Sequence, residues 1–228
     1  HTKVTGIRTK HSIDFSDEPA LAMLHLEDTR TNIGEDLLTD VAILAIGHSA
    51  RDTFGLLNLS DIKMEPKPFA VGVRVEHSQD MIDESQYGKN APESLPAAAY
   101  KLTAKTKEGR GVYTFCMCPG GYVVNASSEE NRLAVNGMSY SGRNGKNANS
   151  AVIVTVSPED FPEKGILGGL AFQRQLEEAA FAEGQGKIPV QLFGDFKKNV
   201  PSSSAGAIAP QMKGAYSWGN VRSIFPEF

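Results

Sequence analysis

The chain has 228 residues, of which 40% are hydrophobic and 22% are charged, and its formal net charge is −4. This composition is typical of a globular protein with one or two cores and excludes a disordered chain. The acidic balance, with a pI near 5.8, excludes a nucleic-acid partner held by phosphate contacts, and the apolar runs are too short for a membrane span of about 20 residues.

Residues 1–66 predict a small β-meander followed by a helix. Short apolar or alternating runs predict strands at 4–7, 21–26 and 41–46, and turn-forming residues separate them at 14–19 and 29–36. The run at 41–46 has no polar alternation, which favours a central strand covered on both faces. After Gly47, residues 50–59 predict a short helix.

We place a domain boundary at 65–68, because Pro66 and Pro68 force an extended chain there. The first domain then covers residues 1–66 and the second covers 67–228.

The second domain opens with a strand at 69–76, where residues alternate with period two. Arg74 and Glu76 share one face of this strand, and the opposite face carries Val71, Val73 and Val75. Residues 78–110 are rich in Asp, Glu, Lys, Gly and Pro and predict irregular loops.

A β-hairpin is predicted from 111–118 and 122–126. The turn between them is Pro119-Gly120-Gly121, which supplies the fixed and the positive φ values of a tight turn.

The remaining sequence predicts one long loop, one strand, two helices and a linker. The loop covers 135–150 and the strand 151–156. Ser157 and Pro158 indicate the start of a short helix, and apolar residues at helical spacing predict a longer helix at 170–183. The last forty or so residues resemble a linker.

The run that ends at Gly47 is the first candidate for a ligand site. A glycine at a strand end lets the backbone approach a flat or extended ligand at the carboxyl edge of a sheet. An ordinary strand-to-helix turn has the same sequence features, so the residues alone leave both interpretations open.

The two cysteines, Cys116 and Cys118, are too close in sequence to be the disulfide framework of a secreted domain, which favours a reducing, cytoplasmic setting. No metal site is expected, because a structural zinc site needs four ligands. In a regular strand both thiols point the same way, so buried structural cysteines are favoured over redox chemistry. Arg74 and Glu76 favour an exposed ion pair over a substrate contact, and His48 and His77 favour structural roles.

Four segments together resemble a known family: AIGHSARDT at 45–53, KPFAVGVRVEH at 67–77, YTFCMCPGG at 113–121 and NGMS at 136–139. They are similar to a bacterial family of FAD-dependent dehydrogenases, the NAD/FAD-utilising oxidoreductases, within the glutathione-reductase-type flavoprotein superfamily. The resemblance spans nearly the whole chain and is more informative about the cofactor than about the reaction.

The resemblance implies an α+β fold, with a β-meander and strand remnant of a Rossmann-like FAD-binding fold in 1–66 and an inserted mixed antiparallel-sheet domain with a few helices in 67–228. It implies cofactor contacts at Ala45, Ile46, Gly47 and His48, and flavin-facing or substrate-facing positions at Arg74, Pro119, Gly120 and Gly121. No G-x-G-x-x-G occurs in the sequence, so we expect this internal piece of a longer protein not to retain FAD by itself.

The expected partners are a small-molecule substrate and a nicotinamide cofactor, with a homodimer through exposed sheet edges of the piece. An alternative is a non-catalytic module that binds a ligand or protein and has a vestigial flavin fold. A thiol-based redox role for Cys116 and Cys118 is a third hypothesis.

Overall fold

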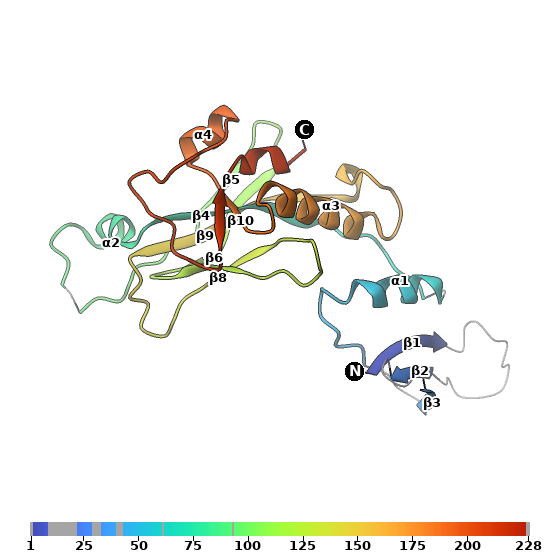
Figure 1. The fold of residues 1–228 in the computed structure, drawn as a ribbon. Coiled ribbons are helices and arrows are strands. Elements are labelled where there is room, and N and C mark those ends of the chain that lie inside the picture. Colours follow the sequence, from blue (N-terminus) through green and yellow to red (C-terminus); the bar gives the residue numbers. More distant parts are fainter. Residues whose placement is uncertain are drawn as a thin grey trace. The chain divides into compact units, whose positions relative to one another are not determined.

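The computed structural model describes residues 2–8, 22–28, 33–39, 43–60, 62–92 and 94–226. The chain divides into two compact units, each considered by itself below (Figure 1). The first comprises His1–Pro66 with Glu163–Leu170, and the second comprises Lys67–Pro162 with Ala171–Phe228. Helices and mostly antiparallel sheets occur together, which makes this an α+β protein.

The first unit contains a three-stranded antiparallel sheet in the order β1-β2-β3. Its elements are β1 (Thr2–Arg8), β2 (Ala22–Asp28), β3 (Ile33–Thr39) and the helix α1 (Arg51–Leu59). The strand predicted at 4–7 and the helix predicted at 50–59 are confirmed, and the strand predicted at 21–26 is confirmed for residues 22–26. Residue 21 lies outside the described residues. The turn predicted at 29–36 is wrong for residues 33–36, because β3 pairs with β2 along its whole length. Residues 29–32 and the predicted turn at 14–19 lie outside the described residues.

The central strand predicted at 41–46 is wrong for the part of it that the structure describes. Residues 43–47 belong to no strand, and Ile43, Leu44 and Ile46 are 88%, 46% and 37% exposed. The physical reason is that a strand is held by its neighbours, and no described strand of this chain pairs with the run. Val41 and Ala42 lie outside the described residues.

A four-stranded antiparallel sheet in the order β4-β9-β6-β5 dominates the second unit (Figure 1). It contains β4 (Phe69–Ser78), β9 (Asn147–Val156), β6 (Gly111–Cys118) and β5 (Thr103–Lys105). The strands predicted at 69–76 and 151–156 are confirmed. The two longest strands, β4 and β9, pair over ten residues, from Phe69 opposite Val156 to Ser78 opposite Asn147.

A second sheet has the order β11-β7-β8, and β10 pairs with β12. These strands are β11 (Met212–Lys213), β7 (Tyr122–Asn125), β8 (Val135–Met138), β10 (Ile188–Val190) and β12 (Tyr216–Trp218). The loop predicted at 135–150 is therefore wrong at both ends, since it contains β8 and the start of β9. The linker predicted for the last forty residues is also wrong, because β11 and β12 pair with distant strands.

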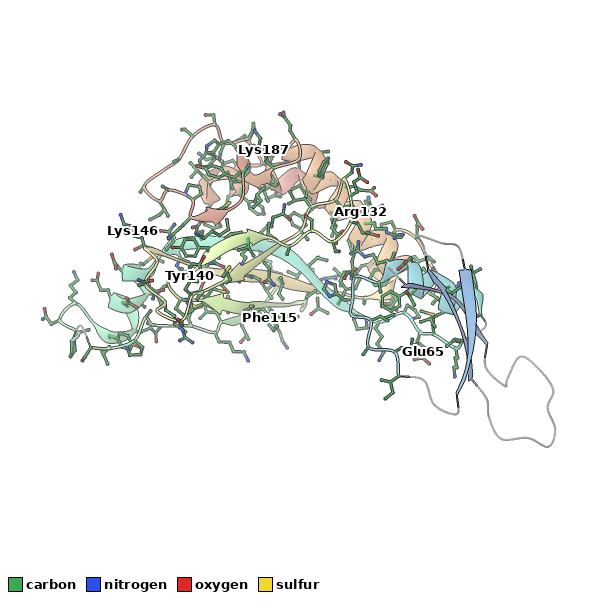
Figure 2. All side chains as sticks on the ribbon, turned by 60° about the horizontal axis from the view of Figure 1, so that its bottom comes forward. Glu65, Phe115, Arg132, Tyr140, Lys146 and Lys187 are labelled. Atoms are coloured by element: carbon green, nitrogen blue, oxygen red, sulfur yellow. The ribbon has the colours of Figure 1, made fainter. Side chains whose placement is uncertain are left out.

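The hairpin predicted around Pro119-Gly120-Gly121 is wrong in its pairing. A turn does lie between β6 and β7, and Gly120 has a φ of +49°. However, β6 pairs with β5 and β9 while β7 pairs with β8 and β11, so the turn passes the chain from one sheet to another. An irregularity between Phe115 and Cys118 breaks the register of β6 just before the turn, and such a bulge bends a strand away from its sheet. Phe115 is labelled on β6 in Figure 2.

The helices of the second unit are α2 (Gln79–Tyr87), α4 (Phe193–Lys198) and all but the first three residues of α3 (Gly168–Glu183). The helix predicted at 170–183 is confirmed as α3, and the short helix after Ser157 is a 3-10 turn at Pro158–Asp160. The prediction of loops throughout 78–110 is wrong because this range contains α2 and β5. Gly88, with a φ of +84°, ends α2.

Two apolar clusters anchor α3 to the strands. One contains Val156, Phe161 and Phe172, with Phe69, Val71 and Leu176 packed against it. The other contains Leu133, Ile188 and Val190, with Ala180, Phe181 and Trp218 among its neighbours. Beside α3 in Figure 2, Arg132 donates a hydrogen bond of 2.7 Å to Glu178.

Truncation of the most buried aromatic of α3 tests this packing. Phe172 is 1% exposed, so Phe172→Ala should lower the free energy of unfolding by about 3–5 kcal/mol through lost burial and the cavity left behind. Phe193→Ala is the matched control, because Phe193 is 74% exposed and its loss should cost less than about 1 kcal/mol. Urea unfolding of both variants measures the difference, and equal costs would contradict the assignment of this core.

Candidate functional site

The predicted cofactor residues Ala45, Ile46, Gly47 and His48 lie in the exposed segment that precedes α1. Gly47 has a φ of +74°, and a side chain added there would meet nothing within 4 Å. The backbone at Gly47 is therefore open to an approaching group, as a glycine at a ligand site requires.

In the second unit, strand register gathers polar residues on one face of the four-stranded sheet. Glu76 on β4 and Cys118 on β6 both lie opposite Asn149 of β9. Paired residues share a face, and so do residues two apart in one strand. Arg74 therefore lies on the same face as these three residues. We call Arg74, Asn149, Cys118, Cys116 and Gly137 of β8 the Arg74 cluster, and Glu76 lies beside it.

Arg74 makes three hydrogen bonds, all to neutral acceptors. Its Nε donates to Asn149 Oδ1 at 2.6 Å, and its Nη2 donates to the Cys116 carbonyl oxygen and to Cys118 Sγ, the latter at 3.3 Å. No carboxylate of the described residues forms an ion pair with this guanidinium. The cross-strand ion pair that the sequence favoured for Arg74 is thus wrong, and a half-buried positive charge is left without a counter-charge from the described residues.

Asn149 supplies a second unusual group. Its side chain is 0% exposed, and its Nδ2 has no hydrogen-bond partner within the described part of the chain. A buried N–H left unpaired costs about 1–3 kcal/mol. Such groups are rare in folded proteins and call for a specific explanation, which includes an acceptor that binds from elsewhere.

Gly137 is the residue that lets Arg74 lie against β8. A Cβ atom at this position would overlap Arg74 Nη2 and Asn149 Oδ1. Only glycine leaves this space for the guanidinium, so Gly137 positions the charge.

The turn at Pro119-Gly120-Gly121 adjoins the cluster and is buried. Gly120 N donates to Gln79 Oε1 at 2.8 Å, and Ser139 Oγ donates to the Pro119 carbonyl oxygen at 2.7 Å. Side chains at Gly120 and Gly121 would overlap backbone atoms of this chain. Close packing of the protein on itself accounts for both glycines.

Glu76 lies next to the cluster and binds the segment before β11. Its Oε1 accepts hydrogen bonds from Asn147 Nδ2 at 2.8 Å and from Gln211 N at 2.6 Å. Burial raises the pKa of Glu76 above its ordinary value, and the two hydrogen bonds oppose this only in part. Glu76 therefore holds a proton more readily than an exposed glutamate.

His77 pairs with Tyr100 rather than standing alone. The His77 Nε2 and Tyr100 hydroxyl oxygen are 2.7 Å apart. Burial raises the pKa of Tyr100, while a hydrogen bond with Ser150 and the charge of Arg74 lower it. Sequence reasoning did not identify Tyr100 as the partner of His77.

The two cysteines differ in exposure, which corrects the prediction that both are buried. Cys116 is exposed and has a φ of +47°, whereas Cys118 is buried. Burial raises the pKa of the Cys118 thiol, and the charge of Arg74 opposes this. The left-handed conformation of Cys116 ends the alternation on which the prediction depended.

Sequence reasoning singled out Arg74, included Gly137 in the segment 136–139 and gave Tyr100 no partner, but it missed Gln79 and Asn149. The one available signal was the polar run Asn147-Ala148-Asn149-Ser150 directly before a β-branched segment. Asparagine is unfavourable in strands, so its presence at the start of β9 indicates a role beyond sheet formation.

The described ranges contain neither a membrane-spanning helix nor a cluster of metal ligands. No helix there is both long and apolar enough to cross a membrane. Within the same ranges, no group of three or more His, Cys, Asp or Glu residues could hold a metal ion.

Comparison with known proteins gives a family match and a relative. Residues 68–228 match the family model described as FAD-dependent protein, C-terminal domain-like. The chain is also 47% identical over 199 residues to an uncharacterised protein of Clostridium beijerinckii. That match covers 86% of this chain and 37% of the relative, so the chain spans little more than a third of the relative's length.

Substitution of Gly137 tests the packing that positions Arg74. Gly137→Ala should lower the free energy of unfolding by about 1–3 kcal/mol, because the new methyl group forces the guanidinium and Asn149 apart. Gly111→Ala on β6 is the control, since a methyl group there meets nothing within 4 Å. Urea unfolding should separate the two variants, and a harmless Gly137→Ala would contradict this packing.

The raised pKa of Glu76 predicts a pH dependence of stability. Between the pKa values of the unfolded and folded chain, the folded state binds more protons, so the free energy of unfolding falls as pH rises through this interval. Glu76→Gln keeps an oxygen that can accept the hydrogen bonds from Asn147 and Gln211, but it removes the carboxyl group and with it this pH dependence. Asp160, whose pKa is lowered chiefly by Arg110, contributes the opposite slope at lower pH in both proteins. The free energy of unfolding of both proteins is measured by denaturation from pH 4 to pH 8, in steps of about one unit around the ordinary pKa of a glutamate. The curves of wild type and Glu76→Gln should diverge as pH rises, and parallel curves would refute the prediction.

Proposed function

The chain belongs to the family of C-terminal domains of FAD-dependent proteins, and from this premise we propose that the complete protein is a FAD-dependent oxidoreductase. In this proposal residues 1–66 are part of its Rossmann-like FAD-binding domain, and residues 67–228 cover the flavin and shape the pocket of a small-molecule substrate. When bound, FAD accepts the electrons of the substrate, which is chemistry that side chains alone do not supply.

The observation that carries the proposal is the Arg74 guanidinium beside the unpartnered Nδ2 of Asn149. Arg74 has no carboxylate partner within the described ranges, and the Asn149 Nδ2 is a buried donor without an acceptor there. Both groups suit an electron-rich partner, such as a carbonyl oxygen of the flavin ring or the carboxylate of a substrate. These residues fit the cofactor class that the family description names.

Arg74 and Asn149 would act by holding negative charge in a site sheltered from water. The positive charge of Arg74 would stabilise an electron-rich ring system once electrons have been transferred, because charge close to a flavin alters its potential. Arg74 is itself fixed by Asn149 and by the carbonyl of Cys116, so little rearrangement is required when charge develops.

The exposed segment before α1 supports a cofactor-side role for the first unit. Large apolar side chains at Ile43 and Leu44 are exposed, and the backbone at Gly47 is open. We propose that strands of the complete protein cover this run, and that Ala45, Ile46, Gly47 and His48 then line the cofactor. A nicotinamide cofactor as electron donor or acceptor is part of the same proposal, as is a role near the flavin for the turn at Pro119-Gly120-Gly121.

The absorption spectrum of the complete protein, purified without added cofactor, tests the FAD proposal. Flavin bands in the near ultraviolet and blue, with FAD released on denaturation, are expected. A colourless, folded protein that does not take up added FAD would contradict the proposal and favour a non-catalytic binding module.

The midpoint potential of the bound flavin tests the role of Arg74. Arg74→Met should lower it by about 30–60 mV, since a charge-assisted contact contributes about 1.5–3 kcal/mol and about 30 mV corresponds to 1.4 kcal/mol for two electrons. Arg143→Met removes an exposed arginine outside the Arg74 cluster and should leave the potential unchanged. Equal potentials in the two variants, with flavin bound in both, would remove Arg74 from the site while leaving the FAD proposal intact.

A further inference from the structure

Strand β6 departs from regular geometry at its two cysteines. It pairs with β9 from Val112 to Phe115, loses register, and pairs again at Cys118. Cys116 in between has a φ of +47°, a left-handed conformation that costs a non-glycine residue about 1–2 kcal/mol. Such strain occurs mostly where a local conformation serves a function.

The two cysteines contact each other at this irregularity. Cys118 Sγ donates a hydrogen bond to the Cys116 carbonyl oxygen at 3.4 Å, and the two side chains also interact with each other. In a fully extended strand, residues two apart lie near the upper limit of the Cα separation that a disulfide allows. The spacing of the two cysteines therefore stays within that limit.

The difference in exposure between the two thiols determines which of them reacts first. Cys116 is exposed and Cys118 is buried. A dissolved reagent therefore meets Cys116 first. Cys118 is buried and lies beside the Cys116 backbone, from where it can react with a group attached to Cys116. A reactive cysteine beside a resolving cysteine is the usual arrangement of a reversible thiol switch.

We propose that Cys116 and Cys118 form a redox-active dithiol that a low-molecular-weight disulfide, such as glutathione disulfide, converts reversibly to an intramolecular disulfide. The reaction depends on residues of this chain alone, so it goes beyond the proposed flavin chemistry and does not require it.

The chemistry is two successive thiol–disulfide exchanges. In the first, the Cys116 thiolate attacks one sulfur of the small disulfide; a mixed disulfide forms, the reagent's sulfur–sulfur bond breaks, and one thiolate leaves. In the second, Cys118 sulfur attacks Cys116 sulfur; the intramolecular bond forms, the mixed disulfide breaks, and the second thiolate leaves. Two electrons pass from the cysteines to the reagent, and the two cysteine protons pass through solvent to the departing thiolates.

Arg74 is a positioning residue for the second step. Its Nη2 donates to Cys118 Sγ at 3.3 Å and also binds the Cys116 carbonyl oxygen, so it fixes both residues of the pair. Its positive charge stabilises the Cys118 thiolate as it attacks. At rest, burial raises the pKa of Cys118 and keeps it protonated, which confines the initial reaction to Cys116.

The test is incubation of the chain in glutathione buffers of graded redox ratio, followed by acid quenching, alkylation of free thiols and mass spectrometry. The wild-type chain should lose two hydrogens, gain no glutathione, and return to the dithiol with dithiothreitol. Cys118→Ser should accumulate a stable glutathione adduct at Cys116. Cys116→Ser should leave Cys118 unmodified over the same period because it is buried.

The rate of ring closure tests the role of Arg74. Arg74→Met should slow closure about tenfold or more, as expected for loss of a hydrogen bond to a charged group, whereas Arg143→Met should not. Among the described residues, the charged or titratable groups that act on Cys118 are Arg74 from β4 and Cys116 from its own strand, β6. Closure should therefore accelerate with rising pH, and Arg74→Met should move that rise to higher pH, which a purely structural role would not do.

A wild-type chain that stops at the mixed disulfide, forms only linked dimers, or does not react would overturn the proposal. This outcome needs no variant, so it does not depend on whether a substitution folds. It is also independent of FAD: a protein that binds flavin but does not close the disulfide refutes the dithiol alone, and the reverse result refutes the flavin proposal alone.

Discussion

The pairing of β4 with β9 over ten residues is the constraint on which the candidate site depends. It places Arg74 and Glu76 on the same face as Asn149 and Asn147, where each β4 side chain bonds to an asparagine of β9. Because Asn149 is a neutral amide, the charge of Arg74 is held in place without being neutralised. A charge fixed in this way is available to a group that binds later.

Glycines and a bulge complete the arrangement. Gly137 leaves room for the Arg74 guanidinium, and the buried turn at Gly120 lets the chain leave one sheet and enter the next beside Cys118. The strained backbone at Cys116 offers its carbonyl oxygen to Arg74. One arginine therefore connects the amide of Asn149, the strained carbonyl and the buried thiol, so the flavin and dithiol proposals share a residue while making separate predictions.

Sequence patterns predicted the elements whose signal is local. The alternation at 69–76 and the helical spacing around Phe172 are properties of the segments themselves, and both elements form as expected. Long-range pairing decided the rest. The apolar run through Ile46 has no partner strand in the described ranges. β6 and β7 pair with different neighbours although the turn between them has a hairpin sequence. The short strands β11 and β12 form because they pair with β7 and β10. The strand pattern was enough to select Arg74 as a candidate. It could not select Asn149, because the lack of a hydrogen-bond partner for its amide depends on the residues that surround it in the folded chain.

In the proposed function, Arg74 and Asn149 interact with an electron-rich group that the complete protein binds. The side-chain amide of Asn149 reports on this directly, because it is buried and its Nδ2 is unpartnered within the described residues. In the nitrogen–proton correlation spectrum of the complete protein, its resonances should shift when FAD binds and shift again when the flavin is reduced. Resonances that stay unchanged while FAD binds and is reduced would contradict the account.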